Sequence, residues 1–112
     1  MMHGTKSPIE LDFVKRKGLV PVIVQDLKTK DVLMLAYANK EALENTIETG
    51  KAWFWSTSNN RLWMKGEESG NIQLVREILV DCDSDALIYL VDSNNPACHT
   101  GKRSCFHNKL VV

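Results

Sequence analysis

Apolar and polar residues alternate in short runs along most of the chain, which is the pattern of half-buried β-strands. Residues 19–25 and 32–37 are two such runs, and the polar turn at 26–31 between them predicts a hairpin. Pro21 has no backbone N–H, so the first strand should either lie at a sheet edge or begin near this residue.

One clear helix should follow this hairpin. Asn39 is a good N-cap for a helix over residues 40–49, and Gly50 is a good signal for its end. Leu43 and Ile47 lie four residues apart, so they should share one face of this helix.

A second, shorter helix is predicted near the N-terminus. Ser7 supplies a capping hydroxyl, Pro8 suits the first helical position, and Glu10 completes a capping box. Gly18 should end this helix, whose role we expect to be packing.

The second half of the chain predicts four more strands. Residues 52–55 and 62–64 flank a short turn and contain all three tryptophans, which usually pack in a core. A polar loop at 65–71 separates them from strands over residues 72–80 and 86–91. We therefore predict an α+β fold with predominantly antiparallel strands, one main helix and a short N-terminal helix.

Length and composition narrow the class of protein. The 112 residues fit one domain, 1–112, and an apolar share of 44% is ordinary for a globular protein. Since 14 basic residues balance 14 acidic ones, the broad cationic surface of a nucleic-acid binder is not expected. No signal-peptide core or bilayer-spanning apolar run is present. We expect a cytoplasmic protein without nucleic-acid or membrane partners.

The stretch Asp81-Cys82-Asp83-Ser84-Asp85 is the first candidate for metal chemistry. In an extended backbone its aspartates would project to one side and Cys82 to the other. Carboxylate oxygens suit a hard cation such as magnesium, whereas a thiolate suits zinc. A single Asp-x-Asp pattern is usually a solvated turn, but this segment could serve two metals.

Two further cysteines, Cys98 and Cys105, lie together downstream of Cys82. An odd number of cysteines in a reducing compartment fits metal binding better than a disulfide framework. Three protein ligands with an open fourth position are typical of a catalytic zinc, whereas a structural zinc is usually closed by four. His99 or His107 could complete a closed site, so the ligand count leaves both kinds of site open.

The sequence resembles the phosphoribosyl-AMP cyclohydrolase family of histidine biosynthesis. The similarity runs from about residue 11 to about residue 107, and it is carried by motifs at 18–26, 33–37, 55–56, 62–67, 81–83 and 98–106. It implies hydrolytic opening of the adenine ring of 1-(5-phosphoribosyl)-AMP between N1 and C6. It also implies a homodimer that requires zinc and magnesium. Many relatives carry a fused pyrophosphohydrolase domain, which we expect this chain to lack.

The resemblance assigns metal ligands residue by residue. It implies a zinc shared between subunits, with one subunit giving Cys82 and its partner giving Cys98 and Cys105. It implies magnesium at Asp81, Asp83 and Asp85. The chain departs from the family's usual pattern at Ser84, Thr57 and Asn71, which weakens any assignment of turn geometry or substrate contact to those positions.

Other residues are candidates for contacts with the substrate. Zinc lowers the pKa of bound water to about 7, and His99 beside a ligand cysteine could move a proton between that water and the ring. His3 and His107 are expected to be structural. Lys102 and Arg103 are the expected partners of a substrate phosphate. The remaining candidates for the nucleotide pocket are Trp55, Ser56, Lys65, Glu67 and Ser69, with core packing the competing role for Trp55.

An alternative function is a small structural zinc module without catalysis. Its site would be closed by the three cysteines and either His99 or His107, and it would turn over no nucleotide. Such a module leaves the three spaced aspartates without a role, so the sequence favours the enzyme.

Overall fold

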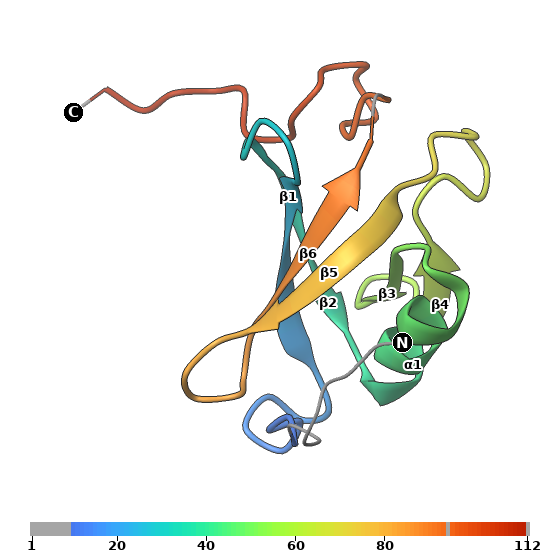
Figure 1. The fold of residues 1–112 in the computed structure, drawn as a ribbon, viewed down its shortest axis with the longest axis vertical. Helices are drawn as coiled ribbons and strands as arrows, with labels where there is room; N and C mark the ends of the chain where they lie inside the picture. Colours follow the sequence, from blue (N-terminus) through green and yellow to red (C-terminus); the bar gives the residue numbers. More distant parts are fainter. Residues whose placement is uncertain (1–9, 94, 112) are drawn as a thin grey trace.

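A four-stranded sheet forms the centre of the computed structural model, which describes residues 10–93 and 95–111 (Figure 1). Two antiparallel hairpins build it, and they join through a parallel pairing of β1 with β6 that sets Val22 opposite Leu87. The strand order is β2-β1-β6-β5, with bounds β1 (Val20–Asp26), β2 (Val32–Ala38), β5 (Leu74–Val80) and β6 (Leu87–Asp92). The predicted α+β class with predominantly antiparallel strands is therefore confirmed.

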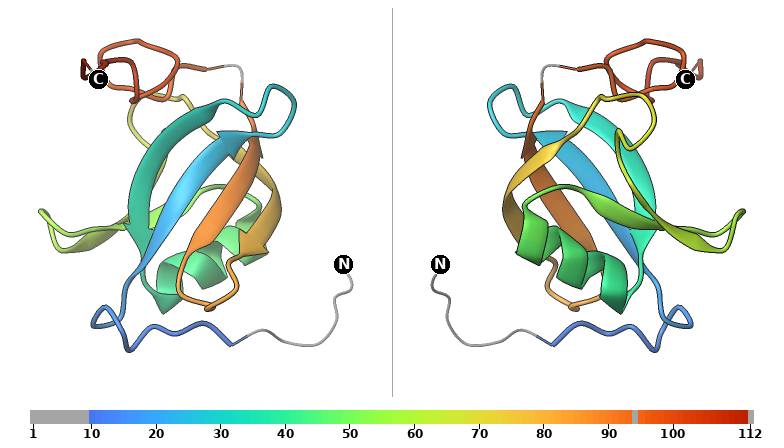
Figure 2. Two further views of the ribbon diagram at one scale, coloured as in Figure 1. Left: turned by 90° about the vertical axis from the view of Figure 1, so that its left-hand side faces the viewer. Right: turned by 90° about the vertical axis from the view of Figure 1, so that its right-hand side faces the viewer.

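A helix and a second hairpin complete the fold. Helix α1 (Lys40–Thr49) lies against one face of the sheet, and the hairpin of β3 (Trp53–Ser56) and β4 (Arg61–Met64) projects away from it (Figure 2). Asn39 caps α1, since its side chain accepts the Ala42 amide at 2.8 Å. In the described part of the chain, no helix combines the length and apolar content needed to cross a membrane.

The core lies between the sheet and the elements that cover this face. Val20, Val22 and Val24 alternate along β1 and are fully buried, as strand geometry requires of one face. Phe54 is also fully buried, with its ring centroid 5.7 Å from that of Tyr89. The three tryptophans are only half-buried, so Phe54 rather than a tryptophan forms the centre of the aromatic packing.

Helix α1 has the predicted bounds but a different buried face. Ala42 and Thr46 are buried, whereas Leu43 is half-buried and Ile47 is 66% exposed. The Thr46 hydroxyl explains why this face of the helix is buried. It donates a hydrogen bond to the Ala42 carbonyl at 3.0 Å and accepts one from the Trp53 amide at 3.0 Å. A polar side chain with both roles satisfied can thus face the core.

The predicted N-terminal helix is wrong over its described part. Residues 14–18 form a turn, and the predicted cap residues Ser7 and Pro8 lie outside the described residues. The Asp12 carboxylate accepts a hydrogen bond from the Val14 amide at 3.1 Å. Lys17 and Gly18 both adopt positive φ. This local hydrogen bonding competes with a helix and ends in a left-handed bend.

The position of Pro21 settles the alternative posed by the sequence. Strand β1 lies inside the sheet rather than at its edge, and it begins at Val20. Its pairing with β6 starts only at Val22, so the missing N–H of Pro21 lies outside that ladder. Of the two expectations for Pro21, a strand that begins near this residue is confirmed, and an edge strand is not.

The opposite face of the sheet carries an apolar row. The strand register sets Leu35, Ile23, Ile88 and Leu79 side by side across all four strands. Leu35 and Leu79 are 48% and 44% exposed, and the two isoleucines are half-buried. We call these four residues the apolar row. An exposed apolar patch of this kind often marks an interaction surface.

Candidate metal and substrate site

The turn between β5 and β6 gathers three carboxylates. One ligand oxygen from each of Asp81, Asp83 and Asp85 lies within 4.8 Å of the others, so the three could hold a metal ion together. The predicted extended backbone is wrong, because residues 82–85 turn and Ser84 has a φ of 60°. The Asp85 amide donates to the Asp81 carboxylate at 2.9 Å. The carboxylates thus converge through a tight turn and not through the alternation of a strand.

Lys15 and Arg16, which no sequence pattern singled out, form ion pairs with Asp85. The Lys15 ammonium is 2.7 Å from the Asp85 Oδ2, and the Arg16 Nη1 is 3.3 Å from the same oxygen. The hydrogen bond from Lys15 is the main cause that lowers the pKa of the buried Asp85 carboxyl to about 2. The Asp12 amide also donates to the Ser84 carbonyl at 2.7 Å. Residues 12–18, which we call the N-terminal turn, are therefore bonded to residues 81–85, which we call the acidic turn.

Two cysteines lie in the loop that follows β6. Cys98 is buried, and its sulfur accepts a hydrogen bond from the Thr100 hydroxyl at 3.1 Å. That hydrogen bond is the main reason that the pKa of Cys98 falls to about 6, so this thiol is a thiolate at neutral pH. Partial burial and the neighbouring Cys98 raise the pKa of Cys105, whose backbone N–H donates to the Leu33 carbonyl at 2.8 Å.

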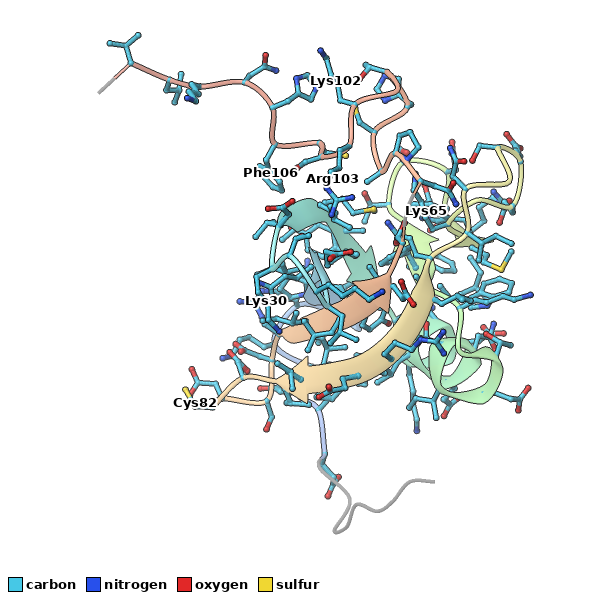
Figure 3. All side chains as sticks on the ribbon, turned by 45° about the horizontal axis from the view of Figure 1, so that its top comes forward. Lys30, Lys65, Cys82, Lys102, Arg103 and Phe106 are labelled. Atoms are coloured by element: carbon cyan, nitrogen blue, oxygen red, sulfur yellow. The ribbon has the colours of Figure 1, made fainter. Side chains whose placement is uncertain are left out.

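Cys82 lies at the opposite end of the sheet from this loop. Figure 3 shows Cys82 at the tip of the β5–β6 turn, whereas Arg103 and Phe106 of the cysteine loop lie beyond the other end. Cys82 is exposed, as expected of a residue at a turn. A single chain therefore presents one thiol at one end of the sheet and two at the other.

A cavity of about 560 Å³ opens beside the β3–β4 hairpin. Its walls come from this hairpin, from β2 through Ala36 and Tyr37, and from the loop after β4. The five residues predicted for a nucleotide pocket all line it: Trp55, Ser56, Lys65, Glu67 and Ser69. Their contact with a substrate stays a prediction, but the fold brings them to one place.

Two of these residues also hold the loop in shape. Glu67 accepts the Met64 amide at 2.7 Å and the Arg61 guanidinium at 2.8 Å, which lowers the pKa of its carboxyl, mainly through Met64. Lys65 donates to the Ala97 carbonyl at 2.7 Å. Because Ala97 precedes Cys98, this hydrogen bond joins the cavity to the cysteine loop.

Gly66→Ala tests the shape of this loop. Gly66 has a φ of +91°, and an added Cβ would meet the Asn71 carbonyl carbon at 2.5 Å. We expect this variant to be less stable than Gly70→Ala by about 1–3 kcal/mol. Gly70 is the matched control, since its φ is +82° but its Cβ would meet nothing within 4 Å. Urea unfolding measures the difference, and equal midpoints for the two variants would contradict the close packing of the loop.

The structure separates the other predicted substrate residues from this cavity. Arg103 lies 3.1 Å from Asp31 and 3.6 Å from Asp26, so it ties the cysteine loop to the β1–β2 turn. Lys102 and His99 are exposed on the same loop and do not line the cavity. The phosphate contacts of Arg103 and Lys102 stay a prediction, since neither residue lines this cavity.

His107 lies closer to the thiol chemistry than the sequence suggested. Its Nε2 is 3.9 Å from the Cys98 sulfur, although we had expected this histidine to be structural. The sequence left His99 and His107 as alternative fourth ligands, and the structure sets the His107 Nε2 beside the Cys98 sulfur. The position of His107 reflects the path of the chain after Cys105.

A polar cavity that is joined to a loop with two cysteines is typical of an enzyme that acts on a small polar molecule. A family model described as phosphoribosyl-AMP cyclohydrolase matches residues 34–107. The phosphoribosyl-AMP cyclohydrolase of Nitrosopumilus maritimus is 66% identical over 105 residues, which are 94% of this chain and 97% of that protein. The corresponding protein of Archaeoglobus fulgidus is 60% identical over 91% of this chain and 94% of its own length. The chain therefore belongs to the phosphoribosyl-AMP cyclohydrolase family, which confirms the resemblance.

Proposed function

We propose that this protein hydrolyses the adenine ring of 1-(5-phosphoribosyl)-AMP between N1 and C6, as a step of histidine biosynthesis. The observation that carries the proposal is the 66% identity to a phosphoribosyl-AMP cyclohydrolase over 94% of the chain. The cavity of about 560 Å³ has a size suited to a small-molecule substrate.

The donor set of the chain fits zinc. Cys98 is a thiolate at neutral pH because its pKa is about 6, and zinc prefers thiolates to carboxylates. Cys105 lies in the same loop, and Cys82 is exposed at a turn where another molecule can reach it. The proposed site takes these three cysteines as ligands and leaves the fourth position open.

A homodimer provides the way to bring the three cysteines together. The apolar row is exposed on one sheet face, and burying it against a second copy would remove that apolar area from water. If the strands of the two copies run in opposite directions, the β5–β6 turn of one copy lies beside the cysteine loop of the other. Cys82 then meets the partner subunit's Cys98 and the partner subunit's Cys105.

The same arrangement assembles the proposed active site. When bound, zinc would supply a water acidified to a pKa of about 7 for attack on C6. Trp55 offers an aromatic face to the base at the cavity wall. His99, next to Cys98, is the proposed group that carries a proton to N1 as the C6–N1 bond breaks. Asp81, Asp83 and Asp85 would hold magnesium near a substrate phosphate.

The proposed function can be tested by ring opening with purified protein. We expect turnover with zinc and magnesium present, loss of turnover after chelation of zinc, and recovery when zinc is returned. Absorbance of the opened product measures the reaction. A protein that binds zinc fully yet gives no turnover in any metal state would instead be the structural module, closed by three thiolates and His107.

A further inference from the structure

Two side-chain cations already contact one carboxylate of the acidic turn. Asp85 is buried, and its Oδ2 receives both the Lys15 ammonium at 2.7 Å and the Arg16 guanidinium at 3.3 Å. A divalent ion held by all three aspartates needs an oxygen of Asp85 as well. A divalent ion bound there would therefore compete with the Lys15 ammonium for the Asp85 carboxylate.

We propose that Lys15 is a displaceable counter-ion of Asp85, which sets how tightly the acidic turn binds a divalent ion. The inference rests on the proposed function only in assigning a divalent ion to Asp81, Asp83 and Asp85. Lys15 acts on the metal through Asp85, so it is a positioning residue and not a ligand.

The contacts of the two basic residues differ in a way that identifies Lys15 as the one that leaves. Arg16 donates to the Asp85 backbone carbonyl at 3.1 Å as well as to its carboxylate, so it stays anchored when the carboxylate turns to a metal. For Lys15, the Asp85 carboxylate is the only side-chain hydrogen-bond acceptor within the described residues. The Lys15 side chain is 46% exposed and can swing into solvent.

The rest of the N-terminal turn stays in place during this exchange. The Asp12 amide holds the Ser84 carbonyl at 2.7 Å, and the Asp12 carboxylate holds the Lys15 amide at 3.0 Å. These backbone contacts do not involve the Lys15 ammonium. The chain thus provides a fixed turn with one movable cation, the Lys15 ammonium. This charge reduces the repulsion among the three close carboxylates while no metal ion is bound.

Mn²⁺ binding to the full, zinc-loaded protein tests the inference without any measurement of turnover. Electron paramagnetic resonance of free Mn²⁺ gives the affinity of the protein for Mn²⁺. Displacement of Mn²⁺ by added Mg²⁺ then gives the affinity for Mg²⁺. We expect Lys15→Met to bind Mn²⁺ about five- to tenfold more tightly than the natural chain, because a competing charge is removed. Lys15→Arg, which keeps the charge, should stay within about twofold of the natural affinity.

Two further variants make the test specific. Lys17→Met removes an equal charge from an exposed side chain of the same turn, and it should leave the affinity almost unchanged. In an Asp85→Asn background, Lys15→Met should no longer have an effect, since its partner is gone. Thermal unfolding of each variant shows that it is folded.

The outcomes separate this inference from the proposed function. Unchanged or weaker Mn²⁺ binding in a folded Lys15→Met variant overturns the counter-ion role, even if the enzyme turns over its substrate. Equal effects of Lys15→Met and Lys17→Met also overturn it, because they would reflect net charge alone. An absence of Mn²⁺ binding in every variant overturns both the inference and the magnesium assignment, while the zinc-dependent reaction stays open to its own assay.

Discussion

Cys98→Ala is expected to lose its zinc and at least about 10³-fold of its turnover, because the uncatalysed water has a pKa near 15.7 and zinc-bound water one near 7. Cys98 is the buried thiol of the site, and its pKa of about 6 favours the thiolate form that binds zinc. Metal content measured by mass spectrometry and steady-state kinetics on the same preparation check both effects.

His107→Ala is the matched control for this variant. It removes the nitrogen that lies 3.9 Å from the Cys98 sulfur but keeps all three thiols. We expect it to retain zinc, since three protein ligands suffice for a catalytic site. Loss of zinc in His107→Ala would show a closed site with four protein ligands, and a Cys98→Ala variant with full zinc and activity would refute the three-thiolate site.

The local elements of the fold could be predicted because short-range signals determine them. Helix α1 begins after Asn39 and ends at Gly50, as its capping residues indicated. The β1–β2 and β3–β4 hairpins were predicted from strands separated by short turns, whereas the β5–β6 hairpin was not, because residues 81–85 were expected to be extended. The parallel pairing of β1 with β6 could not be predicted in this way, because more than half of the chain separates the two strands.

The candidate site shows the same division between local and distant contacts. The residues that line the cavity come mostly from one continuous stretch, so the motifs at 55–56 and 62–67 already held four of the five predicted residues close together, and Ser69 follows two positions later. The ion pair of Arg103 with Asp31 could not be foreseen, because the two residues lie 72 positions apart in sequence, and the phosphate contact of Arg103 stays a prediction. Lys15 was missed for the same reason, since Asp85 is 70 positions away. Basic residues carry no sequence signal that tells which distant carboxylate they meet.

The convergence of Asp81, Asp83 and Asp85 was predicted from an incorrect backbone. A strand would place the three carboxylates on one face, but the turn places them together by curling around the Asp81 carboxylate. Ser84 makes the difference, because its positive φ bends the chain where an extended residue would continue it. The clustering of three carboxylates was readable from sequence, and the turn that brings them together was not.

Complementation between two inactive variants is expected to restore about half of the natural turnover per dimer, because one of the two shared sites is whole. Cys82→Ala keeps the cysteine loop intact, and Cys105→Ala keeps Cys82 intact. A dimer with one copy of each therefore has one site with all three cysteines and one site with a single cysteine. Co-expression with two affinity tags and two purification steps isolates this mixed dimer, and zinc content and ring opening measure the recovery.

Cys98→Ala mixed with Cys105→Ala is the control that gives this experiment its meaning. Both lesions lie in the same loop, so every site of that mixed dimer lacks one cysteine, and no turnover should return. Figure 3 shows why the two mixtures differ, since Cys82 lies at the end of the sheet away from the loop of Arg103 and Phe106. Recovery in both mixtures, or in neither, would mean that the thiols of one site do not come from two chains.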